Sequence, residues 1–267
     1  MAESQEERLE AQSPPDPAQG PTTAPRDPLT TEPPSVRHTL GIIVSGNLAG
    51  LIAGLVAGGI GSRLAMRILA LTSPDAQGAI TEAGEIVGKI TLEGTLFLLA
   101  AGAALGMGGG LAYVAIRRWL PNQVRGLAFG LLMLAVSGRV LVNPDNIDFV
   151  ILDPAWLAIT MFALLPILFG LLIVPLQALL EPVLTRPRSG LVTGVILAAG
   201  LAPLAIGGTI SLVLVILVAA GFLVARSNAV REAWDTATVD IYGRAVLVAT
   251  GIFGLGFFAW GALEILA

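Results

Sequence analysis

The sequence contains no cysteine and only one histidine, and these scarcities exclude whole classes of chemistry. Without cysteine the chain cannot form disulfides, zinc–thiolate sites, iron–sulfur clusters or a thiol nucleophile. The single histidine, His38, cannot build a metal cage by itself. The serine-hydrolase, phosphate-loop and zinc-protease motifs are also missing. We therefore predict no metal site and no cofactor, and no motif predicts an enzyme.

Charge is the second scarcity, because only 13% of the 267 residues are charged and 55% are hydrophobic. Soluble domains carry about 25% charged residues, so this chain has too little polar surface to coat a water-soluble globule. Its mean hydropathy is +0.82, and its charges lie in short stretches between long apolar runs. The predicted partner is therefore the lipid bilayer. No basic patch or motif predicts a nucleic-acid partner.

The first 37 residues differ in composition from the rest of the chain. They are rich in proline and acidic residues and contain no aromatic residue. Such a segment cannot bury enough apolar area to offset the entropy of ordering it. We therefore predict a disordered, acidic, proline-rich cytoplasmic tail over residues 1–37 and an integral membrane helical domain over residues 38–267.

Long apolar runs fill the membrane domain. A hydrocarbon core of roughly 30 Å needs about 20 helical residues, so the sequence predicts an all-α, multi-pass transmembrane helical bundle of about seven spans. The run 190–225 would reach about 54 Å as one helix, and we divide it near Pro203. The predicted spans are residues 40–60, 94–116, 126–142, 154–180, 190–205, 208–225 and 244–266.

The distribution of basic residues predicts the orientation of these spans. Cytoplasmic loops carry an excess of lysine and arginine. With the N-terminus in the cytoplasm, eleven of the fifteen basic residues fall inside, and Arg63, Arg67, Lys89 and Arg139 fall outside. An odd number of spans then places the C-terminus outside. Arginine stands almost everywhere in place of lysine, which indicates a GC-rich genome, so we expect a bacterial cytoplasmic membrane.

Glycine recurs at every fourth position in the first two predicted spans. This spacing lets two helix backbones approach closely and gain dispersion contacts. Two interpretations stay open, namely tight packing within one subunit and a glycine-lined seam in an oligomeric pore, which would make the protein a homo-oligomer. The glycines concerned are Gly46, Gly50, Gly54, Gly58, Gly102, Gly106 and Gly110.

The charged residues on the predicted outer side form the second signal. Arginine at the centre of a bilayer costs about 2.5–3.5 kcal/mol, and less near its edge, so we expect partly buried pairs of arginines with carboxylates. The spacing of residues 82, 85, 89 and 93 also predicts one shared helical face. The candidate outer-face polar cluster comprises Arg63, Arg67, Glu82, Glu85, Glu93, Arg139 and Asp148.

This cluster has two interpretations. It is either an anion, lipid-headgroup or proton-coupled site, or a set of arginines that extend towards the headgroups at helix ends. The absence of motifs favours a structural or accessory membrane protein as the primary prediction. A small-solute or ion transporter or channel is the alternative, and a lipid-acting membrane enzyme that uses the outer-face cluster is the second alternative.

Overall fold

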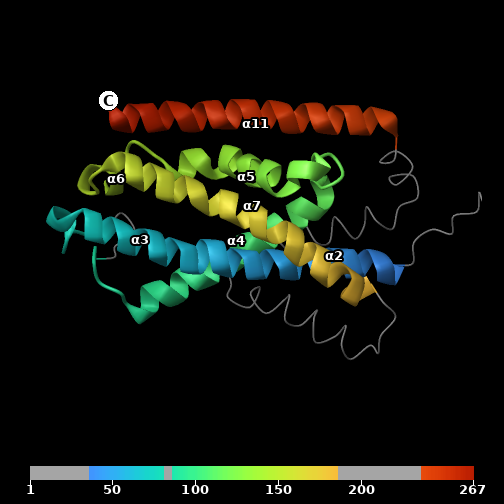
Figure 1. The fold of residues 1–267 in the computed structure, drawn as a ribbon, viewed down its shortest axis with the longest axis horizontal. Helices are drawn as coiled ribbons and strands as arrows, with labels where there is room; N and C mark the ends of the chain where they lie inside the picture. Colours follow the sequence, from blue (N-terminus) through green and yellow to red (C-terminus); the bar gives the residue numbers. More distant parts are fainter. Residues whose placement is uncertain (1–35, 81–85, 186–235) are drawn as a thin grey trace, which may run out of the picture. The chain divides into compact units, whose positions relative to one another are not determined.

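The computed structural model describes residues 36–80, 86–185 and 236–267, all within one compact unit, Ser35–Ala267 (Figure 1). Within these ranges the regular structure is helical, apart from an isolated antiparallel bridge between Ile80 and Ile86. The predicted all-α class is confirmed. The predicted tail lies outside the described residues, except for its last two positions.

Five described helices are long and apolar enough to cross a membrane. They correspond to the predicted first, second, third, fourth and seventh spans. The predicted spans 190–205 and 208–225 lie outside the described residues, so the count of about seven stays a prediction. The candidate spans are Gly41–Thr72, Leu92–Ile116, Asn122–Leu141, Ala155–Thr185 and Ala237–Leu266.

The first span is one long helix with a change of pitch near its middle. Helix α2 (Val36–Gly54) runs directly into the π-helical turn η1 (Leu55–Ile60) and then into α3 (Gly61–Thr72). A π turn holds more residues than an α turn, so it rotates the residues that follow around the helix axis. The remaining elements are η2 (Pro74–Ala76), α4 (Leu92–Ile116), η3 (Asn122–Val124), α5 (Arg125–Leu141), α6 (Asp148–Ile151), α7 (Ala155–Thr185) and α11 (Ala237–Leu266).

The end of α3 is fixed by proline chemistry and by a contact with the segment before α7. Pro74 has no N–H group to continue the helical ladder. The Oγ of Ser73 donates to the carbonyl oxygen of Asp153 at 2.7 Å and accepts from the N–H of Asp153 at 2.9 Å. These two bonds hold the end of the first span against the beginning of the fourth.

The long helices pack in a defined order of neighbours (Figure 1). Helix α2 contacts both α4 and α7, α7 contacts α5, and α5 contacts α11. Helix α11 therefore meets the other described helices mainly through α5. Most of its large apolar side chains are exposed, as expected of a helix whose outer face contacts lipid.

A glycine-rich crossing brings α2 and η1 into backbone contact with α4. A Cβ atom added at Gly54 would lie 2.7 Å from the Cα of Gly106, and one added at Gly50 would lie 2.8 Å from the Cα of Gly110. Such distances permit no side chain, so only glycine allows this approach. The structure places every glycine of the pattern against another helix of the same chain: Gly46, Gly50, Gly54, Gly58, Gly102, Gly106 and Gly110.

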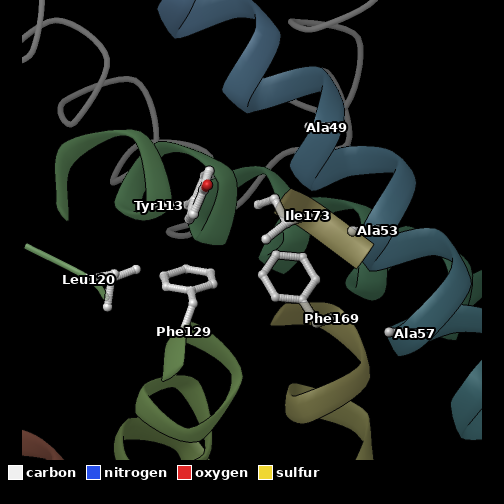
Figure 2. Packing of buried hydrophobic residues seen from close by; sticks show 8 residues of the cluster. All are labelled: Ala49, Ala53, Ala57, Tyr113, Leu120, Phe129, Phe169 and Ile173. Carbon is white, nitrogen blue, oxygen red and sulfur yellow. The ribbon is translucent and has the colours of Figure 1, made fainter. Parts of the chain in front are cut away.

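Aromatic side chains fill the space beside this crossing (Figure 2). The ring of Phe129 on α5 meets the ring of Tyr113 on α4 edge-on, with 5.2 Å between centroids. It also lies 6.2 Å from the ring of Phe169 on α7. The buried methyl groups of Ala49 and Ala53 on α2 belong to the same cluster. Four helices thus share one core.

The contacts at the helix ends show which helix ends lie at the same end of the bundle. Arg117, just after α4, forms an ion pair with Glu181 near the end of α7. Arg118 forms one with Asp240 near the start of α11 at 3.4 Å. The start of α2 also lies against the end of α7. Helix α2 therefore begins, and α11 ends, at opposite ends of the bundle.

Candidate functional site

A pocket of about 320 Å³ lies between α3 and the start of α4, at the end of the bundle where α11 ends. It brings together charged side chains that are far apart in the sequence. Among the described residues, three basic and two acidic side chains line it. The charged lining residues are Arg63, Arg67, Lys89, Glu93 and Asp148.

The pocket forms because α3 and α4 diverge where their glycine contacts end. The last glycine pair is Gly58 and Gly102, where a Cβ added at Gly58 would lie 3.0 Å from the Cα of Gly102. On α4 the four-residue spacing continues from Gly102 to Leu98, and Met66 on α3 lines the same pocket. Their side chains are too large for backbone contact, so the helices separate and leave a cavity.

Arg63 is the most enclosed cation of this pocket. Its Nε and Nη2 atoms are buried, and neither has a hydrogen-bond partner within the described ranges. Arg67, one turn further along α3, is exposed, and so is Lys89. Arg63 as a whole is half-buried, and burial of part of a guanidinium group without a compensating partner is unfavourable. The site therefore favours an anion.

A tight loop carries Lys89 to the pocket. The N–H of Val87 donates to the carbonyl oxygen of Ala79 at 2.9 Å, and the next residue, Gly88, has a φ of +84°, which glycine adopts without strain. Helix α4 begins only after this loop. The predicted helical face that would join Lys89 to Glu93 is therefore wrong, because a loop connects them.

The acidic residues of the pocket are Glu93 on α4 and Asp148 on α6. No ion pair between two described residues joins Arg63 or Arg67 to Glu93 or Asp148. Asp148 is held at the start of α6, where its N–H donates to the Oδ1 of Asn146 at 2.7 Å. Four members of the predicted cluster thus line one pocket, namely Arg63, Arg67, Glu93 and Asp148.

The other members of the predicted cluster are not among the described lining residues of this pocket. Glu82 and Glu85 lie outside the described residues. Arg139 lies against α11, with its Nη1 atom 2.7 Å from the position that a Cβ on Gly261 would take. It is not among the lining residues. The structure therefore divides the predicted arginines into a pair at the pocket and one beside α11.

A second polar group joins α2, α4 and α7 at the opposite end of the bundle. Both terminal nitrogens of Arg117 donate to the carboxylate of Glu181, with Nη2 lying 3.1 Å from Oε1. The Nε2 of Gln177 donates to Glu181 at 3.1 Å and to the Oγ of Ser45 at 2.8 Å. Ser45 in turn donates to the carbonyl oxygen of Ile42 at 2.8 Å. We call Ser45, Arg117, Gln177 and Glu181 the paired network.

Sequence reasoning missed the paired network, although one signal was present. Gln177 and Glu181 are four residues apart, which places them on one face of α7. A polar pair at this spacing in an otherwise apolar span indicates a partner on a neighbouring helix. Gln177 is only 2% exposed, so the pair points into the bundle.

The same end of the bundle holds the start of α11. The Nε1–H of Trp119 donates to the Oδ1 of Asp240 at 3.0 Å. The guanidinium carbon of Arg118 lies 4.9 Å from the centroid of the Trp119 ring, within cation–π range. These contacts attach α11 to the segment that follows α4.

The chemistry of the pocket is ionic recognition. Guanidinium and ammonium groups are the side chains that bind phosphate and carboxylate groups. Within the described ranges, no group of three or more acidic or histidine side chains is arranged to hold a metal ion. No family model, curated protein or solved structure matches the chain. The apolar helices indicate a membrane protein, and the geometry of the pocket supports a more specific function.

Proposed function

We propose that the protein is a multi-pass accessory protein of a bacterial cytoplasmic membrane, and that it binds an anionic ligand in the pocket between α3 and α4. The observation that carries the proposal is Arg63, whose Nε and Nη2 atoms are buried without a partner among the described residues. Three basic and two acidic residues of the described ranges line the pocket, and their formal charges sum to +1. A bound anion compensates this charge where the surroundings solvate it poorly.

The glycine contacts support an accessory protein over a channel built from glycine-lined faces. The glycine faces of α2 and α4 lie against each other within one chain. A pore between subunits along these faces would have to separate them. The pocket needs no such rearrangement, because it lies beyond the last glycine pair.

We also propose that the N-terminus is cytoplasmic and that the pocket lies on the outer side. Arg117, Arg118 and Arg125 gather at the end where α2 begins, in accordance with the excess of basic residues on the cytoplasmic side. Because α11 ends at the opposite end of the bundle, a reporter fused after Ala267 should be active outside the cytoplasm. A reporter that is active only in the cytoplasm contradicts this orientation.

Ligand-dependent stability tests the anion site. Inorganic phosphate and hexyl phosphate are titrated against the full-length protein in an uncharged detergent, at constant ionic strength. A ligand that binds only the folded state raises the unfolding temperature, Tm, in proportion to its occupancy. At least one of these anions should raise the Tm of the wild-type protein.

Two arginines provide a matched pair of variants. Arg63→Gln should abolish the anion-dependent rise in Tm, because it removes the charge that the ligand neutralises. Arg139→Gln removes an arginine at the same end of the bundle but outside the pocket, and it should retain the rise. Equal rises in both variants, or no rise in the wild-type protein with either anion, overturn the proposed function.

A further inference from the structure

The pocket has two chemically different parts. Its basic residues come from α3 and from the loop before α4, whereas apolar side chains from α3, α4 and α7 form most of the remaining lining. These apolar residues include Met66, Phe97, Leu98 and Phe162. A site for a small, fully hydrated anion needs no such surface. A lining of this kind suits an amphiphile with a charged head and a hydrocarbon tail.

The two arginines of the pocket lie at different depths. Helix α3 ends at Thr72, so at 1.5 Å per residue Arg67 lies about 8 Å and Arg63 about 14 Å from that end. The headgroup region of one leaflet is roughly 6 Å thick. With the end of α3 at the membrane surface, Arg67 lies about 2 Å below the headgroup region, within reach of its long side chain, and Arg63 lies about 8 Å below it, in the outer part of the hydrocarbon core.

The rim of the pocket is apolar and exposed. Ile90 is 71% exposed and Phe97 is 66% exposed, yet both line the pocket. Leu92 at the start of α4 is also exposed. Exposed side chains of this size are unfavourable in water and favourable in lipid. The mouth of the pocket is therefore suited to a ligand that enters from the bilayer.

We infer, resting on the proposed function, that the ligand is an anionic phospholipid. Its phosphate group binds the guanidinium of Arg63, its headgroup reaches Arg67 and Lys89, and the first methylene groups of one acyl chain lie against Phe97. A volume of about 320 Å³ is at the small end of ligand sites, so the rest of the lipid lies in the bilayer. The charge of +1 on the described lining residues matches a phosphodiester lipid with one net negative charge.

Binding of three soluble probes tests this inference on the full-length protein in uncharged detergent. The probes are dihexanoyl phosphatidylglycerol, its neutral counterpart dihexanoyl phosphatidylcholine, and glycerophosphoglycerol, which is the same anionic headgroup without acyl chains. The anionic lipid should bind about tenfold or more tightly than either of the others, because only it has both charge and chain. Kd is measured by titration calorimetry and checked by the rise in Tm.

Variants separate the contribution of charge from that of the chain. Arg63→Gln and Arg67→Gln should each weaken binding of the anionic lipid. Arg139→Gln should leave this binding unchanged. Phe97→Ala should weaken the anionic lipid about three- to fivefold and leave the free headgroup unchanged. Leu96→Ala provides the matched control, since Leu96 is an exposed neighbour on α4 that does not line the pocket. Arg67 is exposed, so its variant should fold even where Arg63→Gln does not.

Each outcome has a distinct meaning. If the free headgroup binds as tightly as the anionic lipid, and Arg63→Gln weakens this binding, the phospholipid inference is overturned and the proposed anion site stays intact. Equal binding of the neutral lipid also overturns the inference. Binding of the anionic lipid that is unchanged in both Arg63→Gln and Arg67→Gln, or no binding of any anionic probe, overturns the inference and the proposed function together.

Discussion

Each end of the helical bundle carries an arginine close to apolar helices, but the two arginines have different surroundings. At one end, Arg117 forms a two-point ion pair with Glu181, which also accepts a hydrogen bond from Gln177. At the other end, two nitrogens of Arg63 are buried without a described partner. A compensated charge holds helices together, whereas an uncompensated one is available to a ligand. Whether the arginine has a partner therefore distinguishes a polar group that stabilises the fold from one that can bind a ligand.

The glycine crossing explains part of this difference. Between Gly46 and Gly58 the backbones of α2 and α4 touch, so the side chains that flank the crossing at one end reach each other across α2, α4 and α7. Beyond Gly58 the helices diverge, and no ion pair between described residues joins Arg63 to Glu93 in the pocket that both line. Close packing of the helices brings charged side chains into pairs, whereas divergence of the helices leaves room for a ligand.

The largest effect should come from breaking the paired network. Arg117→Met leaves the carboxylate of Glu181 partly buried without its cation. Removing one partner of a buried pair costs about 3–5 kcal/mol, and because each side chain is about a quarter exposed, we expect about 3 kcal/mol. The free energy of unfolding in mixed micelles, measured with increasing SDS, provides the test.

A double variant shows whether the loss comes from the unpaired charge. Arg117→Met combined with Glu181→Leu replaces both charges with apolar side chains of similar size, which is often neutral for a buried pair. The double variant should regain more than half of the lost stability. A double variant that is less stable than Arg117→Met alone would mean that Glu181 holds the helices through its bond to Gln177.

The second largest effect should come from the glycine crossing. Gly106→Ala places a methyl group 2.7 Å from the Cα of Gly54, so the helices must move apart, at a cost of about 2 kcal/mol. Gly256→Ala on α11 is the matched control, because an added Cβ there meets nothing within 4 Å. The control should be neutral or stabilising by up to about 1 kcal/mol. Equal losses in both variants would contradict close packing as the cause.

A smaller effect on stability, of opposite sign, is expected from a substitution at the pocket. Arg63→Met removes a buried charge that has no described partner, so it should stabilise the ligand-free protein by about 1 kcal/mol. The same unfolding measurement, made in uncharged detergent without phosphate or anionic lipid, compares it directly with Arg117→Met. A loss of stability as large as that of Arg117→Met would show that Arg63 is compensated within the protein and would remove the contrast between the two ends.

Much of the fold could be predicted from the sequence, because the bilayer limits the choices. A helix is the only way to satisfy the backbone of an apolar run of this length, so the five described spans follow from composition. The spacing of Gly50 and Gly54 predicted a close approach. It did not identify the partner helix, because that depends on how each helix is rotated in the bundle.

The candidate site was only partly predictable for the same reason. Arg63 and Asp148 were expected at one face of the membrane, and the structure places both at one pocket. The π turn before Arg63 and the positive φ of Gly88 set the directions of nearby side chains, and neither follows from hydrophobic periodicity. The position of Arg139 beside α11 likewise depends on packing between helices that are distant in the sequence.

The smallest effect should come from the attachment of α11 at the paired end. Trp119→Phe removes the N–H that donates to Asp240 but keeps an aromatic ring at this position. Arg118 keeps its ion pair with Asp240, so the loss is one partly exposed hydrogen bond, about 0.5 kcal/mol. The free energy of unfolding provides the measurement. A loss above about 2 kcal/mol would mean that α11 is anchored mainly through this side chain. The stability of the paired end would then depend on α11 as much as on the paired network, and pairing of charges alone would no longer explain why the two ends differ.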